Sequence, residues 1–482
     1  MMSSINNPEI LAALTSALGS NPASLSQPGT AEYENDNGSY YTAFANEVKP
    51  SFIAKPTTVE QVQSLVRILR PFVLAGSCQL AIRGAGHTPI ASSVNIQDGI
   101  TIDTRGLKGI VLSQDKSTVD ISVGETWTTV YADLDRHGLS TAGGRVGRVG
   151  VPGFILGGGL SMVSSRRGFA CDSVTEFKIV LASGELVRAN ADENTDLWVA
   201  LKGGLNNFGI VTSITMTTFP ATDIWGGITY FLPDTFMQIM SKACGFVNNE
   251  IDQDVHFMWS AGYGYGHRAV SCVMYHTQGK VKPPAIQSFL DVQPQIEQMS
   301  TIRTAKNSDF CEELGRFSID GNRQYWATLT IKPDLDLINT FHERWEETLE
   351  TIKDVEGLIF SLGFHPLTKG LLEASEKAGG NAMDIPPSDG PLFVILINPQ
   401  WALSQDDSRI FGAVERMMGG FKQLAAEKGL LHRYLFTNYA DKADDVMVGY
   451  GKESLERLKA TSAKYDPEGV FQKGVPGGFK LV

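Results

Sequence analysis

Two glycine-rich segments in the first third of the chain carry the residues whose types and spacing could do chemistry. The first, RGAGH at residues 83–87, places Arg83 before a glycine turn and His87 at its exit. Consecutive N–H groups in such a turn can form a concave nest that binds an anion. A dinucleotide-binding fingerprint would need a third glycine that opens a helix, and Pro89 stands at that position. Taken alone, this segment is also explained as a plain structural turn.

The second segment, TAGGRVGRVGVPGFILGGGLSM at residues 141–162, is denser in glycine than an ordinary turn requires. A ligand or another part of the chain must therefore approach its backbone closely. Flexible linkers are polar, whereas this segment interleaves valine, phenylalanine, isoleucine and leucine, which indicates a packed loop. Separate nests, each able to surround a phosphate, are what a pyrophosphate cofactor requires.

Composition restricts the partners of the chain. The formal net charge is −12 and no Lys/Arg-rich run is present, which excludes nucleic acid as a partner and favours a small molecule. Backbone N–H groups and a few arginines must then neutralise an anionic cofactor. The eight histidines lack metal-binding spacing and no G-x-S-x-G motif occurs, so we expect no metal site and no serine nucleophile. The five cysteines include no CxxC pair, as expected of reduced thiols.

The N-terminal residues lack the basic start of a secretory signal. Their short apolar stretch after Glu9 is typical of an amphipathic helix. No apolar run approaches the roughly 20 residues that span a bilayer. We therefore expect an intracellular, cytoplasmic protein without a membrane partner.

The elements that must position these segments change in character near Pro220. Before it, short strands, turns and helices alternate, including a helix capped at Thr57 or Thr58 and another near residues 127–137. From about 222 to 440, long strands alternate with amphipathic helices, which favours an antiparallel sheet with helices on one face. The tail returns to a helix and a polar turn and could rejoin the first part.

The chain resembles the FAD-binding domain of the vanillyl-alcohol oxidase and p-cresol methylhydroxylase superfamily, specifically its berberine-bridge-enzyme-like branch. Its character is that of fungal FAD-linked oxidases of specialised metabolism. The resemblance covers about residues 46–220 and resumes near the C-terminus. The motifs that carry it are KPTTVEQV, IRGAGHT, VGETW, VGVPGFILGGG, RRGFACDSV, LASGELVRAN, DLWVALKGGLNNFGIVT, YLFTNYAD and KYDPEGVF. Each motif is weak alone, and together they are specific.

This resemblance implies an α+β fold. It comprises a two-subdomain FAD-binding domain of the p-cresol methylhydroxylase type and an inserted substrate domain, built on an antiparallel sheet covered by helices. We expect residues 1–221 to form the FAD-binding domain, with its core at about 46–220. Residues 222–440 would form the substrate-binding domain, and residues 441–482 would return to the FAD domain.

In the family, the histidine of the R-x-x-G-H segment bonds covalently to the flavin 8α-methyl, and His87 is the matching residue. A neutral imidazole nitrogen is a competent nucleophile near neutral pH; a histidine that only hydrogen-bonds within the turn is the alternative. The cysteine that makes a second link in some relatives is replaced by Val146, so we expect a single link. A family histidine before the triple glycine is replaced by Phe154.

Val149 matches the family residue that controls the approach of oxygen to the flavin, although simple packing also explains it. The family's FAD contacts fall on a set of mostly small residues around the two segments and in the returning tail. These are Arg83, Gly84, Ala85, Gly86, Thr88, Val149, Gly150, Gly153, Gly157, Gly158, Asp172, Gly209, Val211 and Asn438.

Oxidation needs a group that takes a proton as hydride leaves the substrate. The family's base follows a Gly-Gly pair on the substrate-domain sheet, which puts Asp384 of GGNAMDIP at a position usually held by glutamate. A surface carboxylate near the Pro-Pro turn is the alternative for Asp384. Tyr434 and Tyr439 in the returning segment are further candidates, and each could equally be a packed aromatic. Trp259, Tyr263, Tyr275, Tyr325, Trp326 and Trp401 could line the substrate site, although sheet core is the expected fate of most of them.

The sequence therefore predicts an FAD-dependent oxidase. It would transfer a hydride from an alcohol, an amine or an activated C–H to flavin N5, and O2 would reoxidise the flavin to give H2O2. A flavin-containing cyclase or isomerase without net oxidation is the alternative. A binding or scaffold protein that kept only the fold would be expected to lose the glycines or His87, and both are present. We expect a small-molecule substrate, and a monomer or a dimer.

Overall fold

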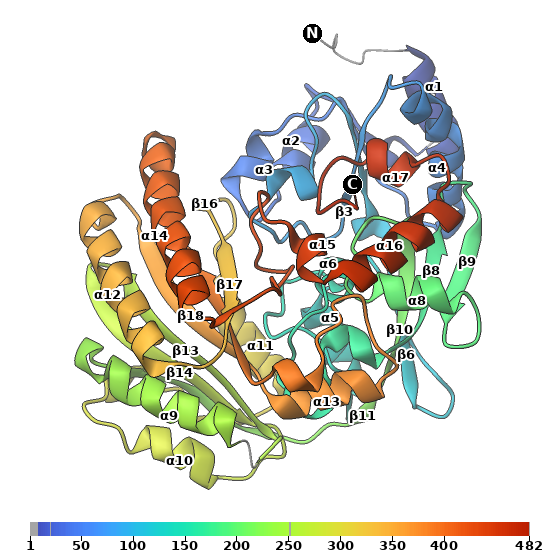
Figure 1. Cartoon of the computed structure of the whole chain (residues 1–482). Helices are drawn as coiled ribbons and strands as arrows, with labels where there is room; N and C mark the ends of the chain where they lie inside the picture. Colours follow the sequence, from blue (N-terminus) through green and yellow to red (C-terminus); the bar gives the residue numbers. More distant parts are fainter. Residues whose placement is uncertain (1–7, 20, 250–251, 482) are drawn as a thin grey trace.

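The computed structural model describes residues 8–19, 21–249 and 252–481. Small sheets and helices from the N-terminal part of the chain stand beside a large sheet that is covered by helices on its outer face (Figure 1). The predicted α+β fold is confirmed. The helix expected after Glu9 is α1 (Pro8–Leu18), whereas residues 1–7, on which the signal-peptide prediction also depends, lie outside the described residues.

The first small sheet has the order β1-β2-β4-β3, with β2, β4 and β3 parallel. Its strands are β1 (Leu25–Ser26), β2 (Phe52–Ala54), β3 (Leu80–Arg83) and β4 (Ile100–Asp103). The helices α2 (Ala31–Asn37), α3 (Ala43–Glu47) and α4 (Val59–Leu74) accompany it. The predicted cap of α4 is Thr58, whose side chain accepts a hydrogen bond from the Gln61 N–H, and apolar residues at helical spacing bury its inner face.

The second small sheet is antiparallel, in the order β5-β6-β10-β8-β9. It consists of β5 (Ile110–Leu112), β6 (Thr118–Ser122), β8 (Val174–Val180), β9 (Leu186–Asn190) and β10 (Ile210–Thr217). Around it lie α5 (Trp127–Asp135), α6 (Val151–Leu156), α7 (Ser164–Arg167), α8 (Thr195–Leu201) and the pair β7 (Leu139–Ser140) and β11 (Phe219–Pro220). Helix α6 differs from the expected packed loop, because Val151 and Pro152 directly after Gly150 start a short helix.

The large sheet has the order β15-β12-β14-β13-β18-β19-β17-β21 and its pairs are antiparallel. Its strands are β12 (Ile224–Phe231), β13 (Val255–Gly264), β14 (His267–His276), β15 (Arg303–Ala305), β17 (Ala327–Ile331), β18 (Ile359–Leu367), β19 (Leu392–Ile397) and β21 (Leu431–His432), with β16 (Arg323–Gln324) and β20 (Gln400–Trp401) beside them. The sequence pattern did not indicate β12 and β18, because internal glycines, and Pro366 in β18, break their hydrophobic runs.

One face of the large sheet packs against α9 (Phe236–Asn248), α10 (Pro284–Leu290), α12 (Leu335–Ile352) and α14 (Asp407–Glu427) (Figure 1). In α12, Phe341, Trp345 and Leu349 recur at helical spacing and are fully buried against the sheet. This arrangement leaves the opposite face of the sheet toward the N-terminal elements.

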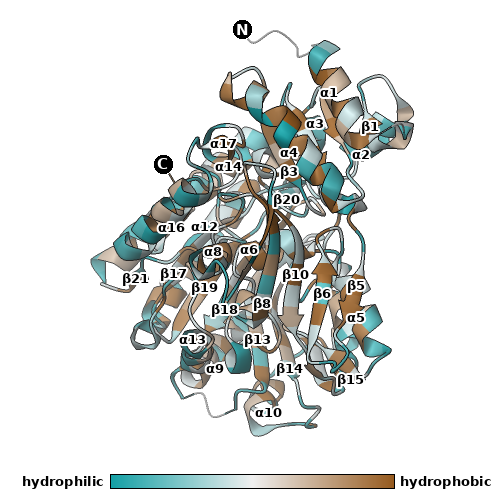
Figure 2. Cartoon of the chain, turned by 90° about the vertical axis from the view of Figure 1, so that its right-hand side faces the viewer, coloured by the Kyte–Doolittle hydropathy of each residue, from teal (hydrophilic) through white to brown (hydrophobic). Residues whose placement is uncertain are grey.

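The C-terminal segment lies among the N-terminal elements rather than beside the large sheet (Figure 1). It contains α15 (Val446–Gly449), α16 (Lys452–Tyr465) and α17 (Val470–Lys473), while α11 (Asn307–Gly315) and α13 (Lys369–Lys377) come from the preceding part of the chain. Figure 2 shows hydrophilic residues along the outside of α16 and hydrophobic residues along β8 in the interior. Among the described helices, none has both the length and the apolar composition of a membrane span.

Candidate active site

A cavity of about 430 Å³ lies where the N-terminal elements, the C-terminal segment and the large sheet meet. The two glycine-rich segments line one side of it, together with residues 205–211 and 478–479. Leu396 comes from β19 of the large sheet, Trp326 directly precedes β17, and residues 436–439 come from the returning segment. Segments that are far apart in the sequence therefore share this site.

The two glycine-rich segments touch each other. A side chain at Gly150 would place its Cβ 2.8 Å from the Ala85 Cβ and 2.9 Å from the Ala85 nitrogen, and one at Gly84 would lie 3.0 Å from Pro152. Gly86 has φ +75°, a backbone conformation that residues with a side chain rarely adopt. The glycines are thus required for the close approach of the segments and for the turn itself.

Several residues of these turns line the cavity and have backbone N–H groups without protein partners in the described part of the chain. Among the described residues, the N–H groups of Gly84, Ala85, Gly86, Thr88 and Gly150 donate to no protein acceptor, although all five residues line the cavity. Unsatisfied N–H groups on a concave turn attract an anion. This donor set fits the pyrophosphate of FAD.

Arg83 does not join that donor set, contrary to the expectation. Its guanidinium is fully buried, donates to the carbonyls of Asp36 and Ser39, lies 3.7 Å from the Asp103 carboxylate and stacks on Tyr40. The Arg83 side chain therefore holds the turn at residues 36–40, and the backbone alone supplies the anion nest.

His87 lies on the wall that separates the cavity from a more polar cleft on the other side of the loop. Its ring stacks on Tyr41 at 4.0 Å and its Nε2 is 2.8 Å from the Ser318 hydroxyl. Burial lowers the pKa of His87 to about 4, against an opposing backbone hydrogen bond. The imidazole is therefore neutral at pH 7, as a nucleophile must be.

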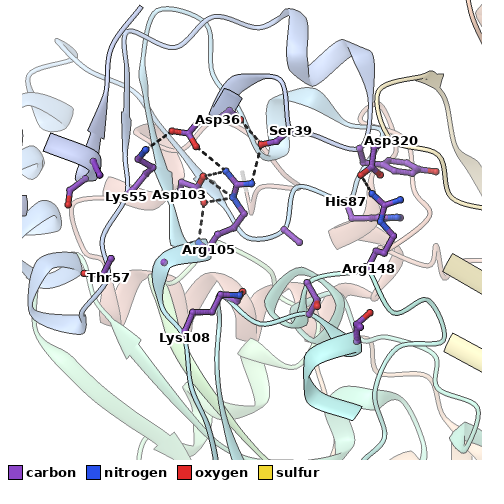
Figure 3. Close-up of a pocket in the computed structure, with 18 of the residues that line it drawn as sticks. Asp36, Ser39, Lys55, Thr57, His87, Asp103, Arg105, Lys108, Arg148 and Asp320 are labelled. Atoms are coloured by element: carbon purple, nitrogen blue, oxygen red, sulfur yellow. Dashed lines mark hydrogen bonds and ion pairs between the residues drawn. The ribbon is translucent and has the colours of Figure 1, made fainter. Parts of the chain in front are cut away.

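The polar cleft, which we call the outer cleft, has a volume of about 710 Å³ and is lined by residues of the first sheet and its loops. Figure 3 shows Lys55, Arg105 and Arg148 paired with carboxylates that also line the cleft, whereas Lys108 pairs with Glu125, which does not line it. Lys55 contacts Asp36 at 2.6 Å, Arg105 contacts Asp103 at 2.6 Å, and Arg148 pairs with Asp320 beside His87.

The cavity of about 430 Å³, which we call the inner cavity, is lined by the guanidinium-bearing residue Arg145. The Arg145 guanidinium donates to the Tyr439 hydroxyl at 2.8 Å, lies 3.3 Å from His365 Nδ1 and contacts the Met258 sulfur at 2.9 Å. Arg145 is 8% exposed, and none of the ion pairs among the described residues includes it. Burial, reinforced by Arg145, lowers the pKa of His365 well below its usual value, so this histidine is neutral.

Aromatic rings position Tyr439. Trp326 meets it edge-on at 5.8 Å between ring centroids, and Phe436 does so at 4.7 Å. The Tyr439 hydroxyl is therefore held at the cavity with a buried cation as its donor. A guanidinium in this position stabilises negative charge on the phenol oxygen.

Two of the proposed catalytic residues do not reach the cavity. Asp384 lies outside it, and its half-exposed carboxylate pairs with Arg457 at 3.0 Å. Tyr434 is fully buried behind the site and donates to the Met383 sulfur. Neither residue lines the cavity, so we do not retain them as catalytic candidates.

The predicted cofactor residues separate into two groups. Val149, Gly153, Gly209, Val211 and Asn438 line the cavity with the first turn. Asp172, Gly157 and Gly158 do not line it.

The second group packs the surrounding loops. Asp172 accepts hydrogen bonds from the Phe169 N–H and the Asn381 amide, and burial raises its pKa. Gly157 leaves room for Asn438, which donates to the Gly153 carbonyl and accepts from the Gly159 N–H. Asp172 and Gly157 therefore support the loops around the cavity without lining the cavity themselves.

Sequence reasoning missed Tyr41, Arg145 and Ser318. Tyr41 and Ser318 lie in polar turns with no motif, so no local pattern marked them. Arg145 lies within the second glycine-rich segment, where a charged residue between glycines was a usable signal. Among the predicted aromatic wall residues, Trp326 lines the cavity, whereas Trp259, Tyr275 and Trp401 are buried in the sheet core.

Comparison with known proteins agrees with this geometry. Residues 50–190 match the FAD binding domain family. The chain is 35% identical over 465 residues to the FAD-dependent monooxygenase tpcD of Cochliobolus heterostrophus, covering 92% of this chain and 89% of that protein. Among solved structures, the carbohydrate oxidase of Microdochium nivale matches with a TM-score of 0.80 and 21% identity, over 98% of this chain and 100% of the other.

The wild-type berberine-bridge-enzyme-like protein 1 of Physcomitrella patens shares the same fold, with a TM-score of 0.78 and 19% identity over 98% of this chain and 99% of that one. The free N–H groups and the apolar walls of the cavity fit the pyrophosphate and the rings of FAD. The chain therefore belongs to the family of the fungal FAD-dependent monooxygenase tpcD, contains an FAD binding domain, and has the fold of berberine-bridge-enzyme-like proteins.

Proposed function

We propose that the protein is an FAD-dependent oxidase of a small, largely apolar organic substrate of specialised metabolism. The observation that carries the proposal is the convergence on one cavity of the free N–H groups, His87 and the Arg145–Tyr439 pair. When bound, FAD accepts a hydride from a C–H that bears OH or NH or is otherwise activated, and passes the electrons to O2, giving H2O2.

Tyr439 is the residue proposed to take the substrate proton. Its hydroxyl lies at the cavity wall and receives a hydrogen bond from Arg145, which offsets the negative charge that the phenol oxygen gains on losing its own proton. The neutral His365 and the Met258 sulfur hold the other side of the guanidinium and supply no competing negative charge.

The walls indicate the class of substrate. Val146, Phe154, Leu160, Trp326 and Leu396 surround the inner part of the cavity, and Asn398 adds a neutral amide. Apolar and aromatic walls with few polar groups favour a ring-containing substrate over a sugar. Val149, with its small side chain, leaves room for O2.

We also propose the division of the chain that the sequence predicted. Residues 1–221 and 441–482 would hold the cofactor, and residues 222–440 would cover it on the substrate side. The position of the C-terminal segment among the N-terminal elements supports this division (Figure 1).

The covalent link at His87 is tested by precipitating the purified protein in acid. Flavin in the pellet is expected, with none above background in His87→Ala, which should still bind FAD reversibly. A colourless wild-type pellet with all flavin in the supernatant would refute the link.

The fate of oxygen distinguishes the proposed oxidase from the two alternatives. Turnover of an added phenol or aromatic alcohol under ¹⁸O2 should give one H2O2 per product and no ¹⁸O in the product. The relative tpcD is called a monooxygenase. If ¹⁸O appeared in the product, the reaction would be the insertion of oxygen into the substrate, and the proposed oxidase activity would be refuted. Anaerobic turnover without bleaching of the flavin would favour a cyclase or an isomerase.

A further inference from the structure

The surroundings of His87 contain a contact that the proposed oxidation does not use. The Ser318 hydroxyl lies 2.8 Å from Nε2 of His87, so it contacts one ring nitrogen and leaves the other, Nδ1, out of this contact. Tyr41 stacks on the ring at an interplanar angle of 22°, so the plane of the imidazole is also held.

Ser318 belongs to residues 317–322, a segment that we call the strap, which precedes β16 of the large sheet. The strap is fastened to the N-terminal elements on two sides. Arg148 pairs with Asp320 (Figure 3) and donates to the Ser318 carbonyl at 3.1 Å. The Gly321 N–H donates to the Tyr41 carbonyl at 2.9 Å. The hydroxyl is therefore held in place by bonds on either side of it.

A neutral imidazole has one N–H and one nitrogen with a free lone pair, and only the latter is a nucleophile. A serine hydroxyl can accept a hydrogen bond or donate one. When the Ser318 oxygen accepts from Nε2–H, the lone pair is on Nδ1. An acceptor at Nε2 thus leaves Nδ1 as the nucleophile, whereas a donor at Nε2 would leave the proton on Nδ1.

We propose that Ser318 is a positioning residue for covalent attachment of the flavin, because it holds His87 in the Nε2–H form and directs the new bond to Nδ1. This inference rests on the proposed link at His87. It concerns the formation of the holoenzyme rather than the oxidation of substrate.

Attachment replaces one C–H bond of the flavin 8α-methyl with a C–N bond, and O2 is the oxidant. The 8α-methyl of the flavin loses a proton to solvent, an N–C bond forms between Nδ1 and the 8α-carbon, and the two electrons pass to the flavin ring and then to O2. The imidazole becomes cationic as the bond forms and then loses the Nε2 proton. Ser318 accepts a hydrogen bond from that N–H and, after it leaves, donates one to the bare Nε2.

The test uses full-length apoprotein mixed with FAD in air, with covalent flavin measured over time as fluorescence of the denatured band. Ser318→Ala should slow incorporation roughly tenfold, the size expected for one hydrogen bond in a partly buried site. Ser318→Thr keeps the hydroxyl and should incorporate flavin at close to the wild-type rate. Ile319→Ala changes the neighbouring exposed strap residue and serves as the matched control.

The bond position is read by NMR of the flavin-bearing peptide after proteolysis, and attachment at Nδ1 is expected. Attachment at Nε2, or a Ser318→Ala rate equal to wild type, would overturn the inference while leaving the link intact. A parallel loss of reversible FAD binding when Ser318→Ala is added to His87→Ala would assign Ser318 a purely structural role and also overturn it. Absence of covalent flavin in the wild type would instead refute the proposed link.

Discussion

The inner cavity and the outer cleft meet at the same wall, formed by Tyr41, Ala85 and His87, but they use charge in opposite ways. In the outer cleft, the cations pair with neighbouring carboxylates, as Lys55 does with Asp36. In the inner cavity, the buried guanidinium of Arg145 has a phenol, a neutral imidazole and a sulfur as partners.

This difference teaches that the pairing of charges, and not their number, distinguishes the two sites. The outer cleft is lined by more charged side chains than the inner cavity. Its charges are already neutralised, so they offer little to a ligand. A buried cation without a carboxylate costs free energy unless negative charge develops beside it. The inner cavity thus suits the proposed role of Tyr439 as the base, because Arg145 offsets negative charge on the phenol oxygen before it takes the substrate proton.

The largest effect is expected from Tyr439→Phe, which keeps the ring and removes the oxygen beside Arg145. Loss of a general base should lower kcat/KM by about 10²–10⁴-fold. Anaerobic flavin reduction by substrate, followed by stopped flow, measures this directly. Tyr434→Phe is the matched control, because its hydroxyl only contacts the Met383 sulfur. A loss of similar size in both variants would contradict the role assigned to Tyr439.

The comparison is sharpened by two arginines of the same loop. Arg145→Met should lower turnover per bound flavin by about 10²–10³-fold, the range for removing a charge-stabilising donor. Arg148→Met, three positions later, breaks a half-exposed pair with Asp320 and should leave turnover per bound flavin within about threefold. Steady-state kinetics normalised to flavin absorbance distinguish them. Equal losses of turnover in the two variants would contradict the distinction between the charge in the inner cavity and the paired charge in the outer cleft.

Stability should depend on pH through the inner histidines. Burial lowers the pKa of His256 and His365 well below 6.5, so the unfolded chain binds protons that the native chain excludes. The free energy of unfolding is therefore fully retained above pH 6.5 and falls below it, by roughly 1.4 kcal/mol per pH unit for each histidine.

Urea denaturation at pH 7.5 and pH 5.5 measures this slope. His256 and His365 are expected to contribute equally to the loss of unfolding free energy between these two pH values, so His365→Gln should remove about half of their joint contribution. His267→Gln, at an exposed histidine, should leave this loss unchanged. An unchanged slope in His365→Gln would show that this buried ring does not set the acid limit of the fold.

The smallest effect is expected in the outer cleft. Lys55→Ala, Asp36→Ala and the double variant should give a coupling energy of only about 0.2–1 kcal/mol, because the pair is partly exposed to water. Turnover should be unchanged. Urea denaturation of the four proteins measures the coupling, and a value of several kcal/mol would show that this pair is energetically like a buried one.

Much of the scaffold was predictable because its signals are local. The cap at Thr58, the helical spacing of α12 and the glycine turn at residues 84–86 are each read within a few residues. The strands β12 and β18 escaped because their glycines are tolerated only by their position inside a large sheet.

The site residues were harder to assign than the scaffold. The resemblance placed Asp384 beside the flavin, whereas the chain turns its side chain toward Arg457 at the surface. Tyr434 and Tyr439 looked equivalent in one short motif, yet only Tyr439 reaches the cavity. A side chain's environment depends on segments that are distant in sequence, and a motif does not contain them.

The sequence by itself determined the cofactor class, the two glycine-rich segments and His87 as the residue at their junction, since backbone freedom and side-chain type are local properties. Only the tertiary structure decided that Arg83 supports a turn, that Arg145 lies beside Tyr439, and that Ser318 meets His87. These contacts join residues more than 40, 290 and 230 positions apart. Their formation depends on how the large sheet and the C-terminal segment pack onto the N-terminal elements.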